Sequence, residues 1–452
     1  MGISSLFNIS RSALFTYQKA LNVVSNNIAN ANNPDYSRQT VVLGTEFPDY
    51  RASFTFGTGV RLDKVIRVSN QVTERQIRNT NNNFYSAQKQ SLVLGQVESF
   101  YSEPSDSGLS SLINQFFNSW NDLSVDPTSS PLRTNVVNSA QRVSEKIENI
   151  HDNLIQMKSD MREDAKNMLK SINGLTEQIH SVNKQIYEAG VVGYSPNDLL
   201  DKRDALLNQL SQIVNINVTM DKNNVANVSI GGVFAVDGLH RIEFKLGQED
   251  GKLLLQTKDG AANVSVSGGQ MEAVFDSFSN KIPSYLNRLD QVANQIFENV
   301  NKVHQKGYSS TDPPQSGLDF FSSYENGKLT INEDILNDHN NIAVSKDGSN
   351  GNNEIALEIA GIKDLKLDNN LTISENYSNY ISDIANDIQT SQQDSDTYGL
   401  VLSQLQQQKM QYSGVSTDEE MMNVMKYQKS YDAAAKLINI ADQLLETLLN
   451  MV

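Results

Sequence analysis

Two amphipathic segments, one near each end of the 452-residue chain, restrict the fold more than any other feature. Over residues 3–31, apolar side chains recur in adjacent heptad columns and share one wide stripe of an α-helix. Over residues 424–452, apolar positions alternate spacings of three and four up to Val452. Stripes of this length need a partner surface, and the alanines in both allow two helices to approach closely. We therefore expect the two segments to pair as a coiled coil.

Nine stripe residues are the candidate assembly interface: Leu14, Tyr17, Leu21, Val24 and Ile28 near one end, and Val424, Tyr431, Ile438 and Leu445 near the other. Either helix alone could be an ordinary core-facing helix. Two such helices at opposite ends favour a shared seam instead. An aspartate at Ile438 or Leu445 should block incorporation of the chain into an assembly, because an unpaired charge in a packed seam is costly.

The first helix is unusually rich in asparagine. Residues 22–36 read NVVSNNIANANNPDY, and six of the twelve residues from Asn22 to Asn33 are asparagine. At roughly 0.6 kcal/mol each relative to alanine, those inside the helix cost about 2–3 kcal/mol together. Such weak helicity is tolerable in a segment that packs against a partner helix, where the side-chain amides could also bond across the seam. Pro34 ends the helix, and Asp35 suits a type I turn better than a type II turn.

Most of the remaining chain has helical periodicity. About sixty residues from Ser130 onward contain a single proline, at their start, which predicts a long rod or a helical hairpin stopped by Gly190. The next helix has Asn197 or Asp198 as its expected N-cap. Further helices are expected over 70–101, 108–126, 271–306 and 373–411, and strands over 39–47 and 59–68.

Residues 214–270 differ in character. The stretch HRIEFKL alternates Ile242, Phe244 and Leu246 with charged residues, and glycines punctuate the region, as in short strands joined by turns. The predicted fold class is therefore mainly α with an inserted small β domain. We expect three parts: a terminal coiled-coil assembly domain (1–38 plus 412–452), a mainly helical middle domain with long helices (39–213 plus 271–411), and an inserted β outer domain (214–270).

Composition excludes several function classes. The net charge is −16, which disfavours binding to nucleic acid or to anionic membranes, and no apolar run is long enough for membrane insertion. The chain contains no cysteine, so it has no disulfides, thiol nucleophiles or cysteine-bound metals. The first residues lack a basic leader and a continuous apolar core, so we expect no cleaved signal peptide.

No residue pattern predicts catalysis, a cofactor site or a metal site. The five histidines show no metal-ligand spacing, GTGVRL is read as a turn, and DGSNGNNE as a polar loop. The acid pair Glu419–Glu420 is read as part of a capping box with Ser416 or Thr417, since nothing in the sequence indicates that the pair is buried. We expect a protein that is not an enzyme.

Several segments carry a family resemblance. LNVVSNNIANANNPDYSRQ resembles the N-terminal motif of flagellar axial proteins, except that Asp35 stands where that motif usually has glycine. NDLLDKRDALLNQLSQIVNINV, SGGQMEAVFDSF, NKVHQKGYS, LDFF and SGVSTDEEMMNVMKYQKSYDAAAKLINIADQLLETLLNM together, in family order, resemble the FlgK family of hook-associated proteins. The C-terminal block is the most specific of these.

The resemblance implies a structural role in the bacterial flagellum. Family members form a homo-oligomeric ring at the hook–filament junction, between hook protein and a second junction protein, and filament assembly needs them. It also implies an extracellular location, export through the flagellar type III apparatus without a cleaved signal, and an export chaperone of the FlgN type on the C-terminal helix. The alternatives are another axial subunit (hook, rod or flagellin-like) or, with less support, a secreted glycan-binding module in 214–270.

Overall fold

The protein is described here by a computed structural model that covers residues 3–51, 54–367 and 370–450, so Val452 lies outside the described residues. The long helices are α1 (Ile3–Ala29), α2 (Gln71–Tyr101), α3 (Leu109–Val125), α4 (Ser130–Val192), α5 (Asn197–Ile213), α7 (Ile282–His304), α10 (Ile373–Ser413) and α11 (Thr417–Leu449). The short ones are α6 (Gly269–Asp276), α8 (Glu333–Asn337), α9 (Glu354–Ala360), a π segment (Ser277–Lys281), and two 3-10 turns (His339–Asn341 and Gly361–Asp364).

The strands are short and all their pairings are antiparallel. They are β1 (Gln39–Thr45), β2 (Asp49–Arg51), β3 (Phe54–Phe56), β4 (Val60–Arg67), β5 (Ile216–Met220), β6 (Ala226–Ile230), β7 (Val233–Asp237), β8 (His240–Arg241), β9 (Phe244–Glu249), β10 (Lys252–Thr257), β11 (Asn263–Val264), β12 (Phe321–Glu325) and β13 (Lys328–Ile331). The predicted strands at 39–47 and 59–68 are β1 and β4, and they pair with each other.

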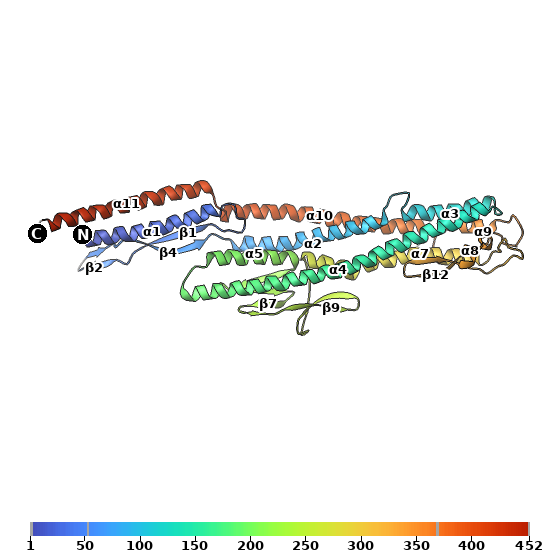
Figure 1. The fold of residues 1–452 in the computed structure, drawn as a ribbon, viewed down its shortest axis with the longest axis horizontal. Helices are drawn as coiled ribbons and strands as arrows, with labels where there is room; N and C mark the ends of the chain where they lie inside the picture. The colour runs from blue at the N-terminus through green and yellow to red at the C-terminus, as the bar shows by residue number, and fades with distance from the viewer. Residues whose placement is uncertain (1–2, 52–53, 368–369, 451–452) are drawn as a thin grey trace.

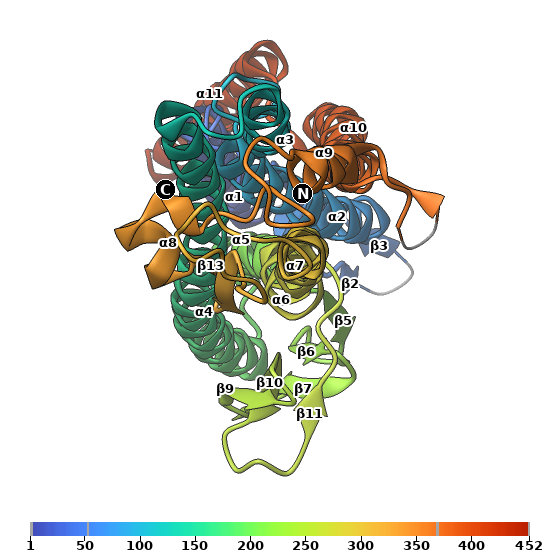
Figure 2. The ribbon, with the colours of Figure 1, turned by 90° about the vertical axis from the view of Figure 1, so that its right-hand side faces the viewer.

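The molecule is a long rod (Figure 1). Helices α1 and α11 lie side by side at the end that holds both termini, and α2 and α10 run along the middle toward the far end, where α3, α8 and α9 gather. Viewed from that far end, the helices form a bundle and the strands β5–β11 project from one side of it (Figure 2). The expected class, mainly α with a small β insert, is confirmed.

Helix α4 is one continuous rod of 63 residues, so the hairpin alternative is wrong. At 1.5 Å per residue it is about 95 Å long. Gly190 does not stop it. The helix runs on to Val192, and its C-cap is Gly193, whose φ of 84° is the left-handed conformation that glycine adopts without strain. Gly190 sits in the last turn, where an α-helical glycine is tolerated.

The expected N-cap of α5 is also wrong. Pro196 occupies the cap position and α5 begins at Asn197. The side chains of Asn197 and Asp198 bond to a neighbouring strand instead: Asn197 Nδ2 donates to the Val65 carbonyl (3.2 Å), and Asp198 Oδ1 accepts from Gln39 Nε2 (2.9 Å). The two polar residues therefore attach α5 to the β1–β4 hairpin.

The β insert consists of a four-stranded sheet, β5-β6-β7-β8, and a three-stranded sheet, β11-β10-β9. The stretch HRIEFKL is not one strand: it divides between β8 and β9, and Ile242 is 42% exposed. Two asparagines of α4 hold the insert. The Asn183 side chain donates to the Ala226 carbonyl and accepts the Ala226 N–H. The Asn173 side chain makes the same two bonds with the backbone of Phe244. The three-part domain division stays a prediction.

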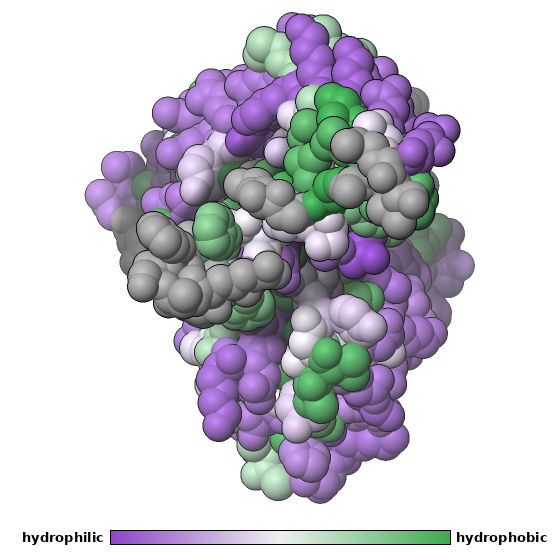
Figure 3. Space-filling view, turned by 90° about the vertical axis from the view of Figure 1, so that its left-hand side faces the viewer, coloured by the Kyte–Doolittle hydropathy of each residue, from purple (hydrophilic) through white to green (hydrophobic). Residues whose placement is uncertain are grey.

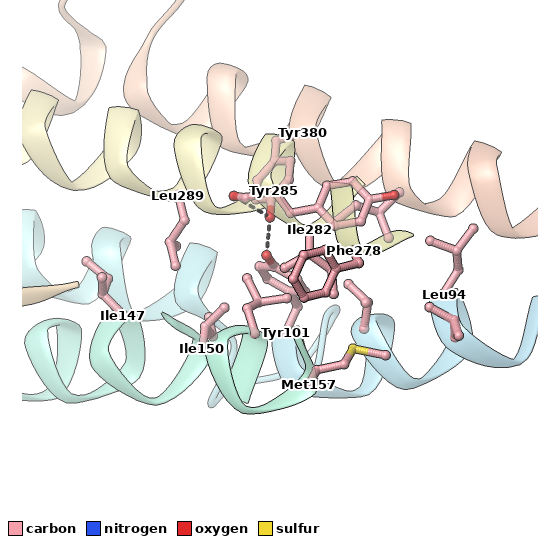
Figure 4. Packing of buried hydrophobic residues seen from close by; sticks show 14 of the residues in the cluster. Leu94, Tyr101, Ile147, Ile150, Met157, Phe278, Ile282, Tyr285, Leu289 and Tyr380 are labelled. Carbon is pink, nitrogen blue, oxygen red and sulfur yellow. Dashed lines mark hydrogen bonds between the residues drawn. The ribbon is translucent and has the colours of Figure 1, made fainter. Parts of the chain in front are cut away.

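The middle of the rod contains a cluster of buried tyrosines (Figure 4). The hydroxyls of Tyr101 (α2) and Tyr380 (α10) hydrogen-bond to each other, and Tyr380 also donates to the carbonyl of Tyr285 in α7 (3.1 Å). Tyr285 in turn donates to Asp387 (3.0 Å). Burial raises the pKa of all three phenols, so these groups stay protonated donors that register α2, α7 and α10 against one another.

Candidate assembly site

The terminal helices pack against each other, as predicted, and the structure shows that they run antiparallel (Figure 1). The most deeply buried apolar residues between them are small: Ala20 on α1, and Ala434 and Ala441 on α11. Small side chains let the two backbones approach closely. One aromatic pair adds to the seam, because the rings of Tyr17 and Tyr427 stack with centroids 6.3 Å apart. On its other side α1 rests on the β1–β4 hairpin.

The nine predicted interface residues are distributed unevenly over this pair. Val24 is buried, while Leu445 is 42% exposed. The other seven are half-buried: Leu14, Tyr17, Leu21, Ile28, Val424, Tyr431 and Ile438. The structure thus brings the two predicted stripes together but leaves part of each open to solvent. Their role in assembly stays a prediction.

Helix α11 keeps an uncovered apolar face. The exposed apolar residues on it are Met421, Met422, Met425, Leu437, Ile440, Leu444, Leu445 and Leu449. On α1, Phe7 and Phe15 are exposed as well. Figure 3, which looks onto the end that holds the termini, shows apolar side chains exposed within a mainly hydrophilic surface. Many exposed apolar side chains on one helix are typical of a surface that a partner covers.

Asn27 ties the terminal pair together at its inner end. Its side chain is 1% exposed and makes four hydrogen bonds. Nδ2 donates to the Gln39 carbonyl (2.8 Å) and to Glu420 Oε2 (3.1 Å), and Oδ1 accepts from the Tyr36 hydroxyl (2.8 Å) and the Gln39 N–H (3.0 Å). One asparagine of the helix-weakening stretch therefore connects α1, the following turn and the start of α11.

The reading of Glu419–Glu420 as a solvated capping pair is wrong for Glu420, which is 2% exposed and bonded to Asn27. Half of the predicted capping box forms, since the Glu419 N–H faces Ser416 Oγ at 3.4 Å. The Glu419 carboxylate does not close the box. It pairs with Arg38 (2.7 Å) across the seam instead.

The turn after α1 has the geometry that suits an aspartate at position 35. The Tyr36 N–H donates to the Asn33 carbonyl (3.2 Å), and the Asp35 N–H donates to Asn33 Oδ1 (3.1 Å). Asp35 does not have positive φ, so the turn at Pro34 is type I rather than type II. The aspartate in place of the expected glycine is thereby accommodated without strain.

A network of buried charges joins this turn to the rod. Asp201 on α5 accepts the Ser37 N–H (3.1 Å) and pairs with Arg67 (2.9 Å), which also pairs with Asp204 (2.7 Å). Burial raises the pKa of Asp201, although its hydrogen bonds to Ser37 and its pairing with Arg67 act to lower that pKa. Burial also opposes ionisation of Asp204, but Arg203 and Arg67 together lower its pKa below the ordinary value. The terminal pair is therefore fixed to the rod through partnered charges.

Sequence reasoning missed Asn27 and Glu420. The available signal was positional. Asn27 falls seven residues after Ala20 and Glu420 falls seven before Tyr427, so both continue a seam column of their helices. A polar residue on a seam position indicates a buried hydrogen bond rather than a solvated side chain.

Two properties of the described residues bear on other functions. Within the described ranges, no helix is long and apolar enough to cross a membrane. Nor do three or more histidine, aspartate or glutamate side chains in that part of the chain lie close enough together to hold a metal ion.

Three family models match the chain. The flagellar hook-associated protein FlgK helical domain matches residues 94–321, which is just over half of the sequence. The flagella basal body rod protein family matches residues 7–36, and the C-terminal family of the basal body rod FlgEFG proteins matches residues 406–451. The last two matches cover most of α1 and all of α11.

Similar proteins and a similar structure carry related names. Flagellar hook-associated protein 1 of Bacillus subtilis is 29% identical, over 98% of this chain and 97% of that protein. Flagellar hook-associated protein 1 of Salmonella typhimurium is 24% identical, over 99% of this chain and 100% of that protein. That alignment is 555 positions long, more than this chain's 452 residues, so part of the Salmonella protein has no counterpart here.

The fold has a solved counterpart. The flagellar hook junction protein FlgK from Burkholderia pseudomallei superimposes with a TM-score of 0.64, over 74% of this chain and 99% of that chain, at 13% identity. At this identity the likeness supports the fold alone. The helical-domain match and the full-length relatives make the assignment: the chain belongs to the FlgK family of flagellar hook-associated proteins.

Proposed function

We propose that this protein is a structural subunit of the flagellum at the junction of hook and filament, and that filament assembly depends on it. The observation that carries the proposal is the terminal pair. Helix α11 packs mainly on α1 and leaves Leu437, Ile440 and Leu444 between 39% and 47% exposed. A face of this kind is stable in a subunit that neighbours cover.

The mechanism is assembly through the terminal pair. Each apolar side chain that a neighbouring subunit covers contributes about 25 cal/mol per Å² of apolar surface removed from water. In the free subunit α11 rests chiefly on α1, whereas the rod has a continuous core. The ends of the chain should therefore open more easily than the rod until neighbours cover them.

The partners follow from this role. Copies of the chain form a ring, with hook protein on one side and a second junction protein on the other. Before export, a chaperone of the FlgN type covers the apolar face of α11, which would otherwise aggregate. The finished protein lies outside the cell, reached by flagellar export without a cleaved signal, and it carries no catalytic site.

Deletion of the gene with electron microscopy of the cells tests the proposal. We expect hooks without filaments, with flagellin lost to the medium, and restoration by the wild-type gene. Filaments of normal number and length in the deletion strain would contradict it. Loss of the hook as well would assign the protein to the hook or rod, the alternative that the helical-domain match over 94–321 disfavours.

A further inference from the structure

A basic pocket lies where the rod meets the terminal pair. It has a volume of about 280 Å³ and is formed by the end of β4, the start of α2, α5 and β5. Its charged lining consists of Arg67, Arg75, Arg78, Arg203, Glu74 and Asp204, and its apolar wall of Val218 and Met220. This surface is unusual in a chain whose net charge is −16.

Two of the four arginines already have partners. Arg67 pairs with Asp201 and Asp204, as described above. Arg203 pairs with Asp204 (3.0 Å) and donates to the Asn224 carbonyl (2.7 Å). Asp201 and Asp204 are therefore paired with Arg67 and Arg203, and within the described residues neither forms an ion pair with Arg75 or Arg78.

Arg78 lacks a partner for a specific reason. Glu74 lies four residues before it on α2, the spacing at which such residues normally pair. The Glu74 carboxylate instead accepts from Lys409 of α10 (2.8 Å) and faces the Asn208 amide (3.5 Å). Within the described part of the chain, Arg78 makes no hydrogen bond or ion pair, although only 8% of it is exposed.

The Arg78 side chain is largely buried and lines the pocket, and a guanidinium enclosed in this way gains from an anionic partner. Burial lowers the pKa of Arg78; Asp204 and Glu74 counteract this, while Arg203 and Arg75 lower the pKa further. A carboxylate bound in bidentate fashion would supply both the missing charge and the missing acceptors. The pocket thus has the chemistry of an anion site.

We propose that the Arg78 pocket binds a carboxylate side chain of a second copy of this chain, an inference that rests on the proposed ring. Two observations select this occupant. The chain has 53 acidic against 37 basic residues, so the surface of a second copy presents many carboxylates. The wall of Val218 and Met220 suits the methylene groups of a glutamate or aspartate better than an inorganic anion.

The first test separates binding from folding. We expect purified Arg78→Gln to melt at the wild-type temperature or above it, because it removes an unpartnered buried charge, while its incorporation into flagella at limiting expression falls roughly tenfold or more. Arg142→Gln, at an exposed arginine on α4, is the matched control and should change neither quantity. A fall in the melting temperature of Arg78→Gln, or normal incorporation, would overturn the proposal.

The second test identifies the occupant. Arg78→Lys keeps the charge and places an amine in the pocket. On flagella isolated from cells, a carbodiimide and one proton add to a neighbouring carboxylate to give an O-acylisourea. The lysine ammonium then gives up one proton and displaces the urea to form an amide. We expect a covalent dimer of this chain joined through position 78 to an aspartate or glutamate, and no such product from Arg142→Lys.

Other cross-linking results count against the proposal. A link only to Glu74 or Asp204 of the same chain, a link to a different flagellar protein, or no link through position 78 would each refute a second copy as occupant. Different results would refute the junction role and the pocket proposal. Normal filaments in the deletion strain refute the junction role, whereas wild-type incorporation of Arg78→Gln with the deletion defect intact refutes only the pocket.

Discussion

At the scale of single residues, the stability of this protein depends on a few buried polar groups. Asn27 makes four hydrogen bonds between α1, the turn and α11, and the tyrosines of the rod hold three helices in register. Each group is satisfied, so removing one partner leaves the other buried and unpaired, at a cost of about 1–3 kcal/mol.

Asn27→Asp tests the polar connection at the start of α11. The new carboxylate would lie against Glu420, so we expect the local free energy of opening of α11 to fall by about 2–4 kcal/mol. Hydrogen exchange of the amides of 417–425 measures it. Asn22→Asp, at an exposed position of the same helix, is the control and should leave exchange unchanged. Equal effects from both changes would show that the Asn27–Glu420 bond is unimportant.

His304 makes stability depend on pH. Nδ1–H donates to the Leu318 carbonyl (2.7 Å) and Nε2 accepts the Ala343 N–H (2.9 Å), so the ring is held neutral. Burial lowers its pKa to about 4, against the bond to Leu318 and the charge of Asp319. The unfolded chain, with a pKa near 6.5, binds the proton first, so stability falls as pH drops from about 6.5 to 4, by roughly 3 kcal/mol.

Urea unfolding at pH 7 and pH 5, with NMR titration of the His304 ring, checks this dependence. The expected result is a lower free energy of unfolding at pH 5 and a ring that stays neutral above pH 5. A His304 pKa near 6.5 in the folded protein would contradict the assignment of the neutral tautomer.

At the scale of elements, the sequence predicted which segments are helical, but it did not predict where α4 ends or how α5 begins. Periodicity correctly predicted α2, α3, α10, the α6–α7 stretch and the continuous apolar face of α4, because each has a long stripe. It placed the end of α4 at Gly190 and the cap of α5 at Asn197 or Asp198, because several residues there are acceptable caps. Tertiary bonds to the β1–β4 hairpin decide the α5 boundary, and sequence alone does not reveal them.

Two glycines of α4 should respond in opposite ways to alanine. Gly193→Ala places a side chain at φ 84° and should cost about 1–2 kcal/mol. Gly190→Ala acts within the helix, where an added Cβ meets no atom within 4 Å, and should stabilise by up to about 1 kcal/mol. Thermal unfolding of both variants measures the difference. The same sign for both would mean that α4 ends elsewhere.

The candidate site was predictable to a similar extent. The two stripes predicted the pairing of α1 and α11, and the alanines predicted its closeness. The partners of Glu420 and Glu74 could not be predicted from the sequence, because Asn27 (bonded to Glu420) and Lys409 (paired with Glu74) lie far from them in the chain. Pairings of this kind appear only when the helices are placed in space.

At the scale of the whole molecule, the rod and the terminal pair differ in how much apolar surface they bury. The rod carries a continuous apolar core, whereas the terminal pair buries little beyond its small seam residues and keeps an apolar face open. The junction role requires that this face be covered by neighbouring subunits.

Hydrogen exchange on the free protein and on isolated flagella tests that division. We expect amides of α1 and α11 to exchange much faster in the free protein than those of α4, and to become protected in flagella. The helix-weakening asparagines of 22–33 favour this result. Protection of α1 and α11 equal to that of α4 in the free protein would show that the ends need no neighbours.

Leu445→Asp tests the central claim, that the open face of the terminal pair is the assembly surface. Leu445 is 42% exposed in the subunit, so the aspartate should leave folding intact; Ile438→Asp, at a half-buried position, should act more strongly but also disturb the pair. The decisive measurement is filament number per cell in a deletion strain that expresses Leu445→Asp, with Gln443→Asp, a polar exposed neighbour, as control. We predict hooks without filaments for Leu445→Asp and normal filaments for Gln443→Asp; normal filaments with Leu445→Asp would contradict the claim.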